Sequence, residues 1–422
     1  MSAQAALTSP RAYRRYWLPE LIVWLAVAVI GTTLFWVTDW DLDAARSFFA
    51  HGSLGGAWPW GEQQPWVFFY HFAPILIGIV AAAAVGGIIW GTVNPARRML
   101  RLYGLFFLLS IAFGPGLIVN TVLKDHFGRP RPRNVVEFGG KDAYLAPLVP
   151  GEQGTGKSFP CGHCSVGFVL VAIYFLLRRR KPWPSLAVLT AVILFGALLG
   201  VGRIAGGAHF ASDVLWSGLI CFGVCWTLYY FVLNVPARED AFAAGRVAGV
   251  SRPRLVIASS VLLGLLIVGG VLLATPQRDH IQFHGNAIPG HAMKSLEIQA
   301  GNCDVEIELF GTGPTVHWVP KLKYTGFGAP GSRIRIHNEE ITPKDPMWIN
   351  QRLSIEQTGW FTELDAVLYL MLEGPDLQRI RVRVQRGDIT VRGRSPTVET
   401  ELDLVTEDGQ VTIIDTPANP SP

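Results

Sequence analysis

Charged residues are scarce in this chain. They make up 16% of its 422 residues, against 50% hydrophobic residues, and the mean hydropathy is +0.31. An ordinary soluble protein is not expected to be this apolar, so the scarcity of charge points to membrane spans. Cysteine is scarce too, and five cysteines are too few for a disulfide framework. The N-terminal residues lack a small-residue cleavage site, so we expect the first apolar run to remain as an uncleaved anchor.

Long apolar runs occur only before Thr275. Six of them reach the roughly 18 residues of a membrane span and a seventh is shorter; they cover about 17–37, 66–90, 102–123, 163–177, 184–202, 210–233 and 254–274. Beyond Thr275 the chain alternates polar and β-branched residues, which is the period of a half-buried strand. We therefore predict an all-α polytopic membrane domain over residues 1–275, followed by an all-β domain over residues 276–422.

The predicted β domain contains a short recurring unit. Turn residues followed by alternating strand residues begin at Gly301 (GNCDVEIE), Gly387 (GDITVRG) and Asp408 (DGQVTI). Such units are typical of a β-sandwich or a β-solenoid, and the pattern leaves both open. The domain resembles bacterial adhesin β-repeat domains and contains no motif that suggests catalysis. We expect any partner of this domain to be a component of the cell envelope.

Lys and Arg are unequally distributed between the two sets of loops. The N-terminus and three alternate loops carry fourteen of them, whereas the loops at 38–65 and 124–162 carry seven. Because basic loops are retained in the cytoplasm, we predict a cytoplasmic N-terminus in the inner membrane of a bacterium. Seven spans then place the β domain outside.

The stretch GEQGTGKSFPCGHCS, residues 151–165, allows three interpretations. Its first eight residues fit a nucleotide-binding phosphate loop. That loop needs a buried strand before it, and here Pro147 and Pro150 interrupt the preceding segment. The second interpretation is a C-x-x-C redox motif, but no thioredoxin-like pattern of strand and helix surrounds it. The third is a helix that begins near Pro160 and binds an anion at its N-terminus.

The two cysteines of this stretch allow more than one state. Cys161 and Cys164 are three residues apart at the expected helix N-terminus, where their α-carbons come within disulfide range. The compartment outside the inner membrane is oxidising, so a disulfide is one hypothesis. The alternative is two free thiols, with Cys164 packed in the helix.

Three polar clusters interrupt the apolar pattern, and the predicted topology places all three on one face. They contain Lys124, Arg129, Arg131, His163, Arg203, His209 and Asp213. Lys and Arg side chains hold phosphate oxygens, and a cationic cluster beside hydrocarbon is costly unless an anion fills it. His209 and Asp213 are four residues apart and share a face of a helix, where the carboxylate can accept the proton of one ring nitrogen. The other nitrogen is then free as a nucleophile, and His163 is left for acid–base work.

The motif spacings resemble those of the type-2 phosphatidate phosphatase superfamily, which includes lipid phosphate phosphatases, bacterial acid phosphatases and vanadium haloperoxidases. The first family motif, Lys, six residues and Arg-Pro, matches Lys124 to Pro132. The second, Pro-Ser-Gly-His, corresponds to Pro160 to His163, and the third, Ser-Arg, five residues, His, three residues and Asp, corresponds to Gly202 to Asp213. The resemblance implies a six-span phosphatase core, here followed by a seventh span.

The resemblance also implies a role for each matched residue. His209 forms a phosphohistidine, Asp213 orients it, and His163 protonates the leaving oxygen and then activates water. The phosphoryl oxygens are held by Lys124, Arg131, Arg203, Gly162 and Cys161, and neither a metal nor another cofactor is required. Cys161 and Gly202 stand where the family has hydroxyl residues. We therefore predict an active enzyme with altered phosphate handling.

Together these inferences predict an integral-membrane phosphatase acting on a lipid phosphate or diphosphate at the extracytoplasmic face. Candidate substrates are phosphatidate, phosphatidylglycerol phosphate, undecaprenyl diphosphate and lipid A. One alternative is a phosphotransferase that passes the phosphoryl group to an acceptor hydroxyl, and another is a non-enzymatic envelope-binding module anchored by the membrane core. Haloperoxidase activity is not expected, because the known examples are soluble, and no nucleic-acid partner is expected.

Overall fold

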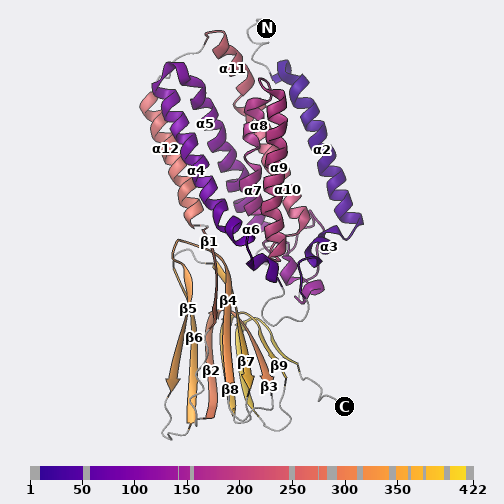
Figure 1. The fold of residues 1–422 in the computed structure, drawn as a ribbon, viewed down its shortest axis with the longest axis vertical. Coiled ribbons are helices and arrows are strands. Elements are labelled where there is room, and N and C mark those ends of the chain that lie inside the picture. Colours follow the sequence, from indigo (N-terminus) through magenta and orange to yellow (C-terminus); the bar gives the residue numbers. More distant parts are fainter. Residues whose placement is uncertain are drawn as a thin grey trace. The chain divides into compact units, whose positions relative to one another are not determined.

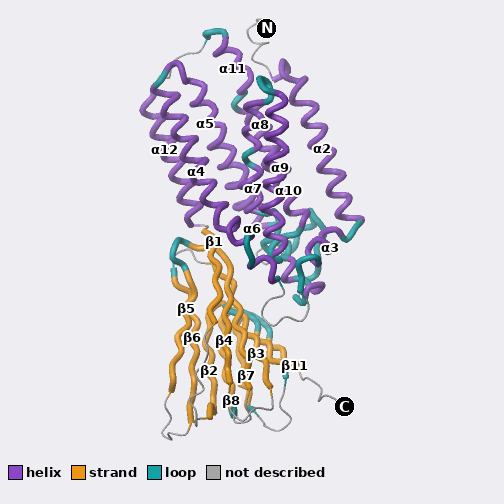
Figure 2. Tube along the Cα trace, in the orientation of Figure 1, coloured by secondary structure: helices purple, strands orange, loops and turns teal. Residues whose placement is uncertain are grey.

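The chain forms two compact units, Met1–Val271 and Leu272–Pro422. The first is helical and the second is built of strands (Figures 1 and 2). In the computed structural model the described residues are 10–50, 58–140, 142–152, 156–246, 252–273, 275–282, 292–310, 317–341, 348–359, 363–373, 377–393 and 400–414. The predicted fold class, a membrane helix bundle followed by an all-β region, is confirmed.

The helical unit consists of long helices that run alongside one another, joined by short helical turns (Figure 1). Its α-helices are α2 (Arg14–Val37), α3 (Trp40–Arg46), α4 (Trp66–Val93), α5 (Arg98–Ile111), α6 (Lys124–His126), α7 (Gly162–Phe168), α8 (Val171–Leu177), α9 (Pro182–Ala205), α10 (Ala211–Thr227), α11 (Val235–Ala243) and α12 (Pro253–Leu273). Its π-helical and 3-10 segments are η1 (Pro10–Tyr13), η2 (Pro59–Glu62), η3 (Pro95–Arg97), η4 (Ala112–Leu123), η5 (Pro132–Asn134), η6 (Val136–Phe138) and η7 (Leu228–Val232).

Among the described residues, six helices are long and apolar enough to cross a membrane. They are Arg11–Val37, Trp66–Val93, Pro95–Leu123, Pro182–Ala205, Ala211–Val232 and Pro253–Leu273. The seventh predicted run corresponds to a shorter apolar stretch, Gly162–Leu177, which contains α7 and α8. Large apolar side chains such as Val23 and Leu265 are more than half exposed on these helices. Exposure of this kind is expected where a helix faces lipid.

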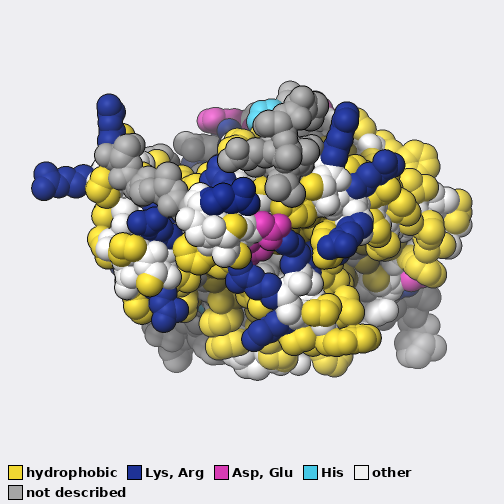
Figure 3. All heavy atoms as spheres, turned by 90° about the horizontal axis from the view of Figure 1, so that it is seen from above, with side chains coloured by type: hydrophobic (Ala, Val, Ile, Leu, Met, Phe, Trp, Pro, Cys, Tyr) yellow, Lys and Arg dark blue, Asp and Glu magenta, His cyan; other side chains and the backbone are white. Residues whose placement is uncertain are grey.

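One end of the helical unit is basic. The turn between α4 and α5 carries Arg97 and Arg98, and residues 178–181 between α8 and α9 read RRRK. Figure 3 shows the unit from above, where dark blue Lys and Arg side chains are spread among hydrophobic ones. Helix α9 begins at this basic end, and its 24 residues span roughly 36 Å before it ends at Ala205. The two ends of α9 therefore lie on opposite sides of the bundle.

The described residues of the strand unit form two sheets. Its strands are β1 (Thr275–Gln282), β2 (Ala292–Asn302), β3 (Asp304–Phe310), β4 (His317–Gly328), β5 (Arg333–Ile341), β6 (Trp348–Thr358), β7 (Glu363–Glu373), β8 (Arg379–Arg386), β9 (Ile389–Arg392), β10 (Glu401–Asp408) and β11 (Val411–Ile414). The orders are β1-β4-β7-β3-β9-β11 in one sheet and β10-β8-β2-β6-β5 in the other. Inward side chains such as Leu296, Val305 and Val382 are fully buried and form a single core.

The recurring sequence unit forms three equivalent corners. At each corner a strand of the five-stranded sheet passes into a strand of the other sheet, β2 to β3, β8 to β9 and β10 to β11, and the equivalent strands pair in parallel. Asp304 Oδ1 accepts a hydrogen bond from Asp388 N at 2.8 Å, and Asp388 Oδ1 accepts one from Gln410 N at 2.7 Å. This stacking of rungs is the β-solenoid arrangement, whereas the antiparallel strands β1, β4 and β5 depart from it.

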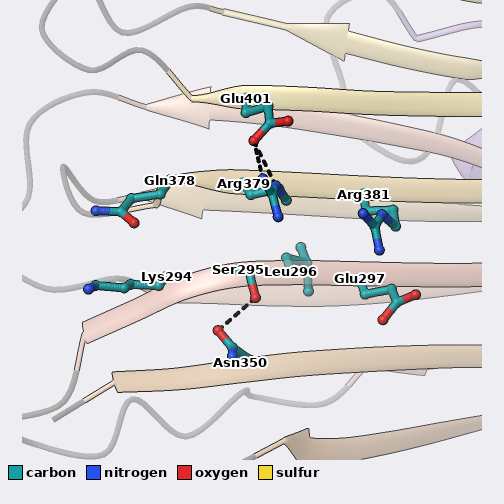
Figure 4. Close-up of a pocket in the computed structure, with 9 residues that line it drawn as sticks. All are labelled: Lys294, Ser295, Leu296, Glu297, Asn350, Gln378, Arg379, Arg381 and Glu401. Carbon is teal, nitrogen blue, oxygen red and sulfur yellow. Dashed lines mark hydrogen bonds and ion pairs between the residues drawn. The ribbon is translucent and has the colours of Figure 1, made fainter. Parts of the chain in front are cut away.

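A groove of about 400 Å³ lies on the outer face of the five-stranded sheet. Figure 4 shows the side chains that line it, which come mainly from β2, β8 and β10. Arg379 Nε donates to Glu401 at 2.7 Å, and Ser295 Oγ donates to Asn350 at 2.7 Å. Two pairs of polar side chains in this groove therefore bind each other.

Candidate active site

The predicted site residues come from separate parts of the helical unit. Lys124 begins α6, Arg131 precedes η5, Cys161 to His163 begin α7, Arg203 lies in the last turn of α9, and His209 and Asp213 flank the start of α10. His163 interacts electrostatically with Arg203, Lys124 and His209, which places these four side chains in one neighbourhood. The ends of α7, α9 and α10 therefore meet at the end of the bundle away from the RRRK turn.

A backbone hydrogen bond ties the segment of Arg131 to the loop of His209. Arg133 N donates to Gly207 O at 3.1 Å. Gly207 has a φ of +63°, and a Cβ there would lie 2.4 Å from the Trp58 ring, so glycine is required in this loop. The loop between α9 and α10 is thus held against the segment that follows Lys124.

His209 has one ring nitrogen in a short hydrogen bond. Its side chain is buried, and Nδ1 lies 2.5 Å from the Ser158 carbonyl oxygen, compared with 3.7 Å from Asp213 Oδ2. A carbonyl only accepts, so Nδ1 carries the proton and Nε2 keeps its lone pair. The predicted carboxylate of Asp213 faces the same nitrogen at 3.7 Å and interacts with the ring electrostatically, whereas the closest acceptor is the backbone carbonyl.

The electrostatic surroundings keep His209 neutral. Burial lowers the pKa of the imidazole to about 4; the carboxylate of Asp213 opposes this shift, whereas Arg203 and Lys124 add to it. At neutral pH the ring is therefore uncharged, which is the form of a histidine that attacks phosphorus.

Asp213 is fully buried and bonded on both oxygens. Oδ1 accepts a hydrogen bond from Arg129 at 2.5 Å, and Oδ2 accepts bonds from Ser158 Oγ at 2.6 Å and Phe210 N at 2.8 Å. The last of these caps the N-terminus of α10, where a carboxylate is favourable. Asp213 therefore fixes both the start of the helix and the Ser158 segment that holds His209.

Arg129 and Asp41 belong to this site, although the sequence analysis assigned neither a role. Arg129 is fully buried and donates to Asp41 at 2.8 Å, to Asp213 and to Ser212 Oγ at 2.8 Å. Burial lowers the pKa of Arg129, but the two carboxylates outweigh it and raise the value overall. Arg129 was recognisable as part of the GRPRPR stretch, whereas no signal in the sequence singles out Asp41.

Tyr70 is a second residue that sequence reasoning missed. Its ring on α4 stacks on the His163 ring with the centroids 4.8 Å apart and an interplanar angle of 9°. The Arg203 guanidinium lies 4.7 Å from the centroid of the Tyr70 ring, within range of a cation–π interaction. Tyr70 thus orients two predicted site residues, but it lies in an apolar run where nothing distinguishes it.

The first turn of α7 is sterically constrained. A Cβ at Gly162 would lie 2.4 Å from Asn120 Oδ1, so a larger residue at this position would require the Asn120 side chain to move. Cys161 and Cys164 are joined by a disulfide with a Cα–Cα distance of 5.5 Å, as one of the two hypotheses predicts. The sulfur of Cys161 is therefore bonded and buried where the family has a hydroxyl group.

The second missing hydroxyl has a steric explanation. A Cβ at Gly202 would lie 3.0 Å from Cε3 of Trp66, so the tryptophan ring packs where a serine side chain would begin. Among the described residues, no three His, Cys, Asp or Glu side chains are grouped to hold a metal ion. An anion at this site would be bound by cationic side chains.

Comparison with known proteins identifies the family. A model of the PAP2 superfamily matches residues 103–236, which include every candidate residue from Lys124 to Asp213. A lipid A 4'-phosphatase of Francisella tularensis subsp. novicida (strain U112) is 32% identical over 215 residues, covering 50% of this chain and 94% of that protein. The chain belongs to the PAP2 superfamily. The family predicted from the three motifs is therefore confirmed.

Other relatives of this PAP2 protein are also named for lipid phosphates. The undecaprenyl-diphosphatase BcrC of Bacillus subtilis (strain 168) is 29% identical over 154 residues, covering 36% of this chain and 68% of that protein. A crystal structure of a transmembrane PAP2 type phosphatidylglycerolphosphate phosphatase from Bacillus subtilis covers 50% of this chain and 96% of its own, with 22% identity and a TM-score of 0.26. The lipid A 4'-phosphatase and the undecaprenyl-diphosphatase support the predicted phosphatase activity on a membrane lipid.

Proposed function

We propose that this PAP2 protein hydrolyses a lipid phosphate or diphosphate at the extracytoplasmic face of a bacterial inner membrane, through a phosphohistidine on His209. One observation carries the proposal: the Ser158 carbonyl holds Nδ1–H of a buried, neutral His209 and leaves Nε2 unprotonated within the electrostatic reach of Lys124 and Arg203. A neutral nucleophile beside fixed cations suits attack on an anionic phosphoryl group.

In the first step Nε2 of His209 attacks phosphorus and the bond to the leaving oxygen breaks. His163 gives its proton to that oxygen, and the charge of the bound phosphate favours the protonated form of His163 beforehand. Lys124, Arg131 and Arg203 hold the phosphoryl oxygens as charge builds up on them. The backbone at the start of α7, including Gly162, offers further donors to an anion.

In the second step water attacks the phosphorus and the bond to Nε2 breaks. His163 now takes a proton from the water, so each histidine returns to its starting state. Asp213 keeps the His209 segment in place in both steps through its bonds to Ser158 and Phe210. Phosphate is released without a metal ion in this scheme, since the three cations supply the stabilising charge.

Purified protein in detergent is expected to release inorganic phosphate from at least one member of a panel comprising phosphatidate, phosphatidylglycerol phosphate, undecaprenyl diphosphate and lipid A.

Orthovanadate should inhibit this phosphate release competitively, because it adopts the five-coordinate geometry that phosphorus has during transfer. EDTA should have no effect on the release. Activity that is lost in EDTA and restored by a divalent ion would contradict the metal-free scheme. Appearance of a phosphorylated acceptor lipid in place of inorganic phosphate would indicate the transferase instead.

The proposed face rests on the charge distribution along the chain. The RRRK turn at 178–181 directly precedes α9, and the proposed site lies at the other end of that helix. Basic turns are retained in the cytoplasm, which puts the site outside. A reporter fused after Pro422 is therefore expected to read as extracytoplasmic, whereas a matched fusion after Asn94, in the basic turn before α5, should read as cytoplasmic. The reverse pair of signals would move the site to the cytoplasmic face.

A further inference from the structure

We propose that Asp41 and Arg129 are positioning residues for His209, acting through Asp213 and Ser158. The inference rests on the proposed function, because it assigns these residues to the same phosphohistidine site. Neither side chain is proposed to touch the substrate. Their role is to hold the hydrogen-bond acceptor that keeps Nδ1 of His209 protonated and Nε2 free.

A continuous set of buried polar contacts links α3 to the nucleophile. Asp41 binds Arg129 at 2.8 Å, and Arg129 binds Asp213 at 2.5 Å. Asp213 accepts the Ser158 hydroxyl at 2.6 Å, and the carbonyl of the same serine lies 2.5 Å from His209 Nδ1. The five side chains are between 0% and 3% exposed, so water does not compete for these bonds.

Asp41 also holds the start of α10. Its Oδ1 accepts from Ser212 N at 2.8 Å and its Oδ2 accepts from Ser212 Oγ at 2.5 Å. Ser212 is adjacent to Asp213, so one carboxylate anchors both the arginine that binds Asp213 and the backbone that carries it. Loss of the Asp41 charge would therefore loosen Asp213 from two sides.

The balance of charge in this network favours the intermediate. Arg129 is one cation bonded to two carboxylates, which leaves the network of Asp41, Arg129 and Asp213 with one negative charge in excess. Phosphorylation on Nε2 while Nδ1 keeps its proton places a positive charge on the ring, and a buried negative charge stabilises it. Neutralising Asp41 would leave a balanced pair of Arg129 and Asp213 and remove that stabilisation.

The test substitutes Asp41→Asn, which keeps the shape and removes the charge. Its matched control is Asp43→Asn, the same substitution on the same short helix, where Asp43 is 58% exposed and pairs only with Arg46 among the described residues. We expect Asp41→Asn to lower kcat about 10-fold, because even a small misplacement of the reacting group weakens transition-state stabilisation. KM should stay within about twofold, because no group that binds substrate is changed. Asp41→Glu, which retains the charge, should recover part of kcat.

Rapid-quench measurement of the labelled phosphoenzyme on the same lipid phosphate, at a temperature where both variants are folded, should show slower formation for Asp41→Asn than for Asp43→Asn. Equal kcat for Asp41→Asn and Asp43→Asn would overturn the inference. If Asp41→Asn gives no folded protein, Ser212→Ala removes one hydroxyl bond to the same carboxylate and should show the same split between kcat and KM; wild-type kinetics for it would overturn the inference too. Failure of wild-type protein to form a phosphoenzyme would instead reject the proposed function.

Discussion

Substitution of His209 by alanine is expected to abolish phosphate release, with a loss of roughly three orders of magnitude or more in kcat. The imidazole Nε2 is the only group to which the proposed scheme assigns the bond to phosphorus, and alanine has no replacement for it. Burial and the bond from Nδ1 to the Ser158 carbonyl keep that nitrogen unprotonated at neutral pH. Phosphate release and acid-quenched phosphoenzyme, measured on the same purified samples, report the two consequences separately.

His337→Ala provides the matched control for this substitution. His337 is an exposed residue of β5 in the strand unit, and we expect its replacement to leave turnover unchanged. If His209→Ala retained near-normal turnover, another group would have to form the bond to phosphorus. If turnover were lost while the labelled phosphoenzyme persisted, His209 would act in the second step and not as the nucleophile.

Replacing Arg129 with methionine is expected to have the largest effect on stability. The guanidinium is fully buried between Asp41 and Asp213, and its removal leaves two buried carboxylates without a countercharge. Breaking a buried pair from one side costs about 3–5 kcal/mol. We expect a large fall in the thermal unfolding midpoint, measured in detergent by intrinsic tryptophan fluorescence. We also expect a low yield of monodisperse protein.

Arg46→Met is the control for that prediction. Arg46 pairs with Asp43 at 2.6 Å, but both side chains are more than half exposed, and such surface pairs contribute at most about 1 kcal/mol. Its unfolding midpoint should therefore stay close to that of the wild type. Equal midpoints for the two variants would show that the buried arginine is not required for folding and that Asp41 and Asp213 tolerate its loss.

Much of the helical unit was predictable because a membrane span is a local property of sequence. An apolar run of sufficient length must form a helix in lipid, where each backbone group needs a partner within its own segment. The described part of the chain contains six such helices, and the short run at 163–177 also falls in an apolar helical stretch. The motif residues Lys124, His163 and His209 were singled out from short spacings and residue chemistry, and the family resemblance assigned their roles.

The β unit was predictable in type but not in pairing. Turn residues at Gly301, Gly387 and Asp408 repeat with the period of strands, so the sequence indicated β structure and left sandwich and solenoid open. The choice depends on which distant strands become neighbours. In the structure β2 pairs with β8, and β3 with β9, in parallel. The Asp304 and Asp388 side chains each accept a hydrogen bond from a backbone N–H of the next corner.

The sequence by itself determined the spans, the family and the residues of the three motifs, because these depend on hydropathy and on short spacings. Only the tertiary structure decided what holds those residues in place. Asp41 is 88 residues from Arg129 and Tyr70 is far from His163 in the chain, so their contacts exist only after the helices pack. The acceptor for His209 is the backbone carbonyl of Ser158, and every residue type has such a carbonyl. No sequence pattern marks one backbone carbonyl over another, so the contact that holds Nδ1 of His209 arises only from packing.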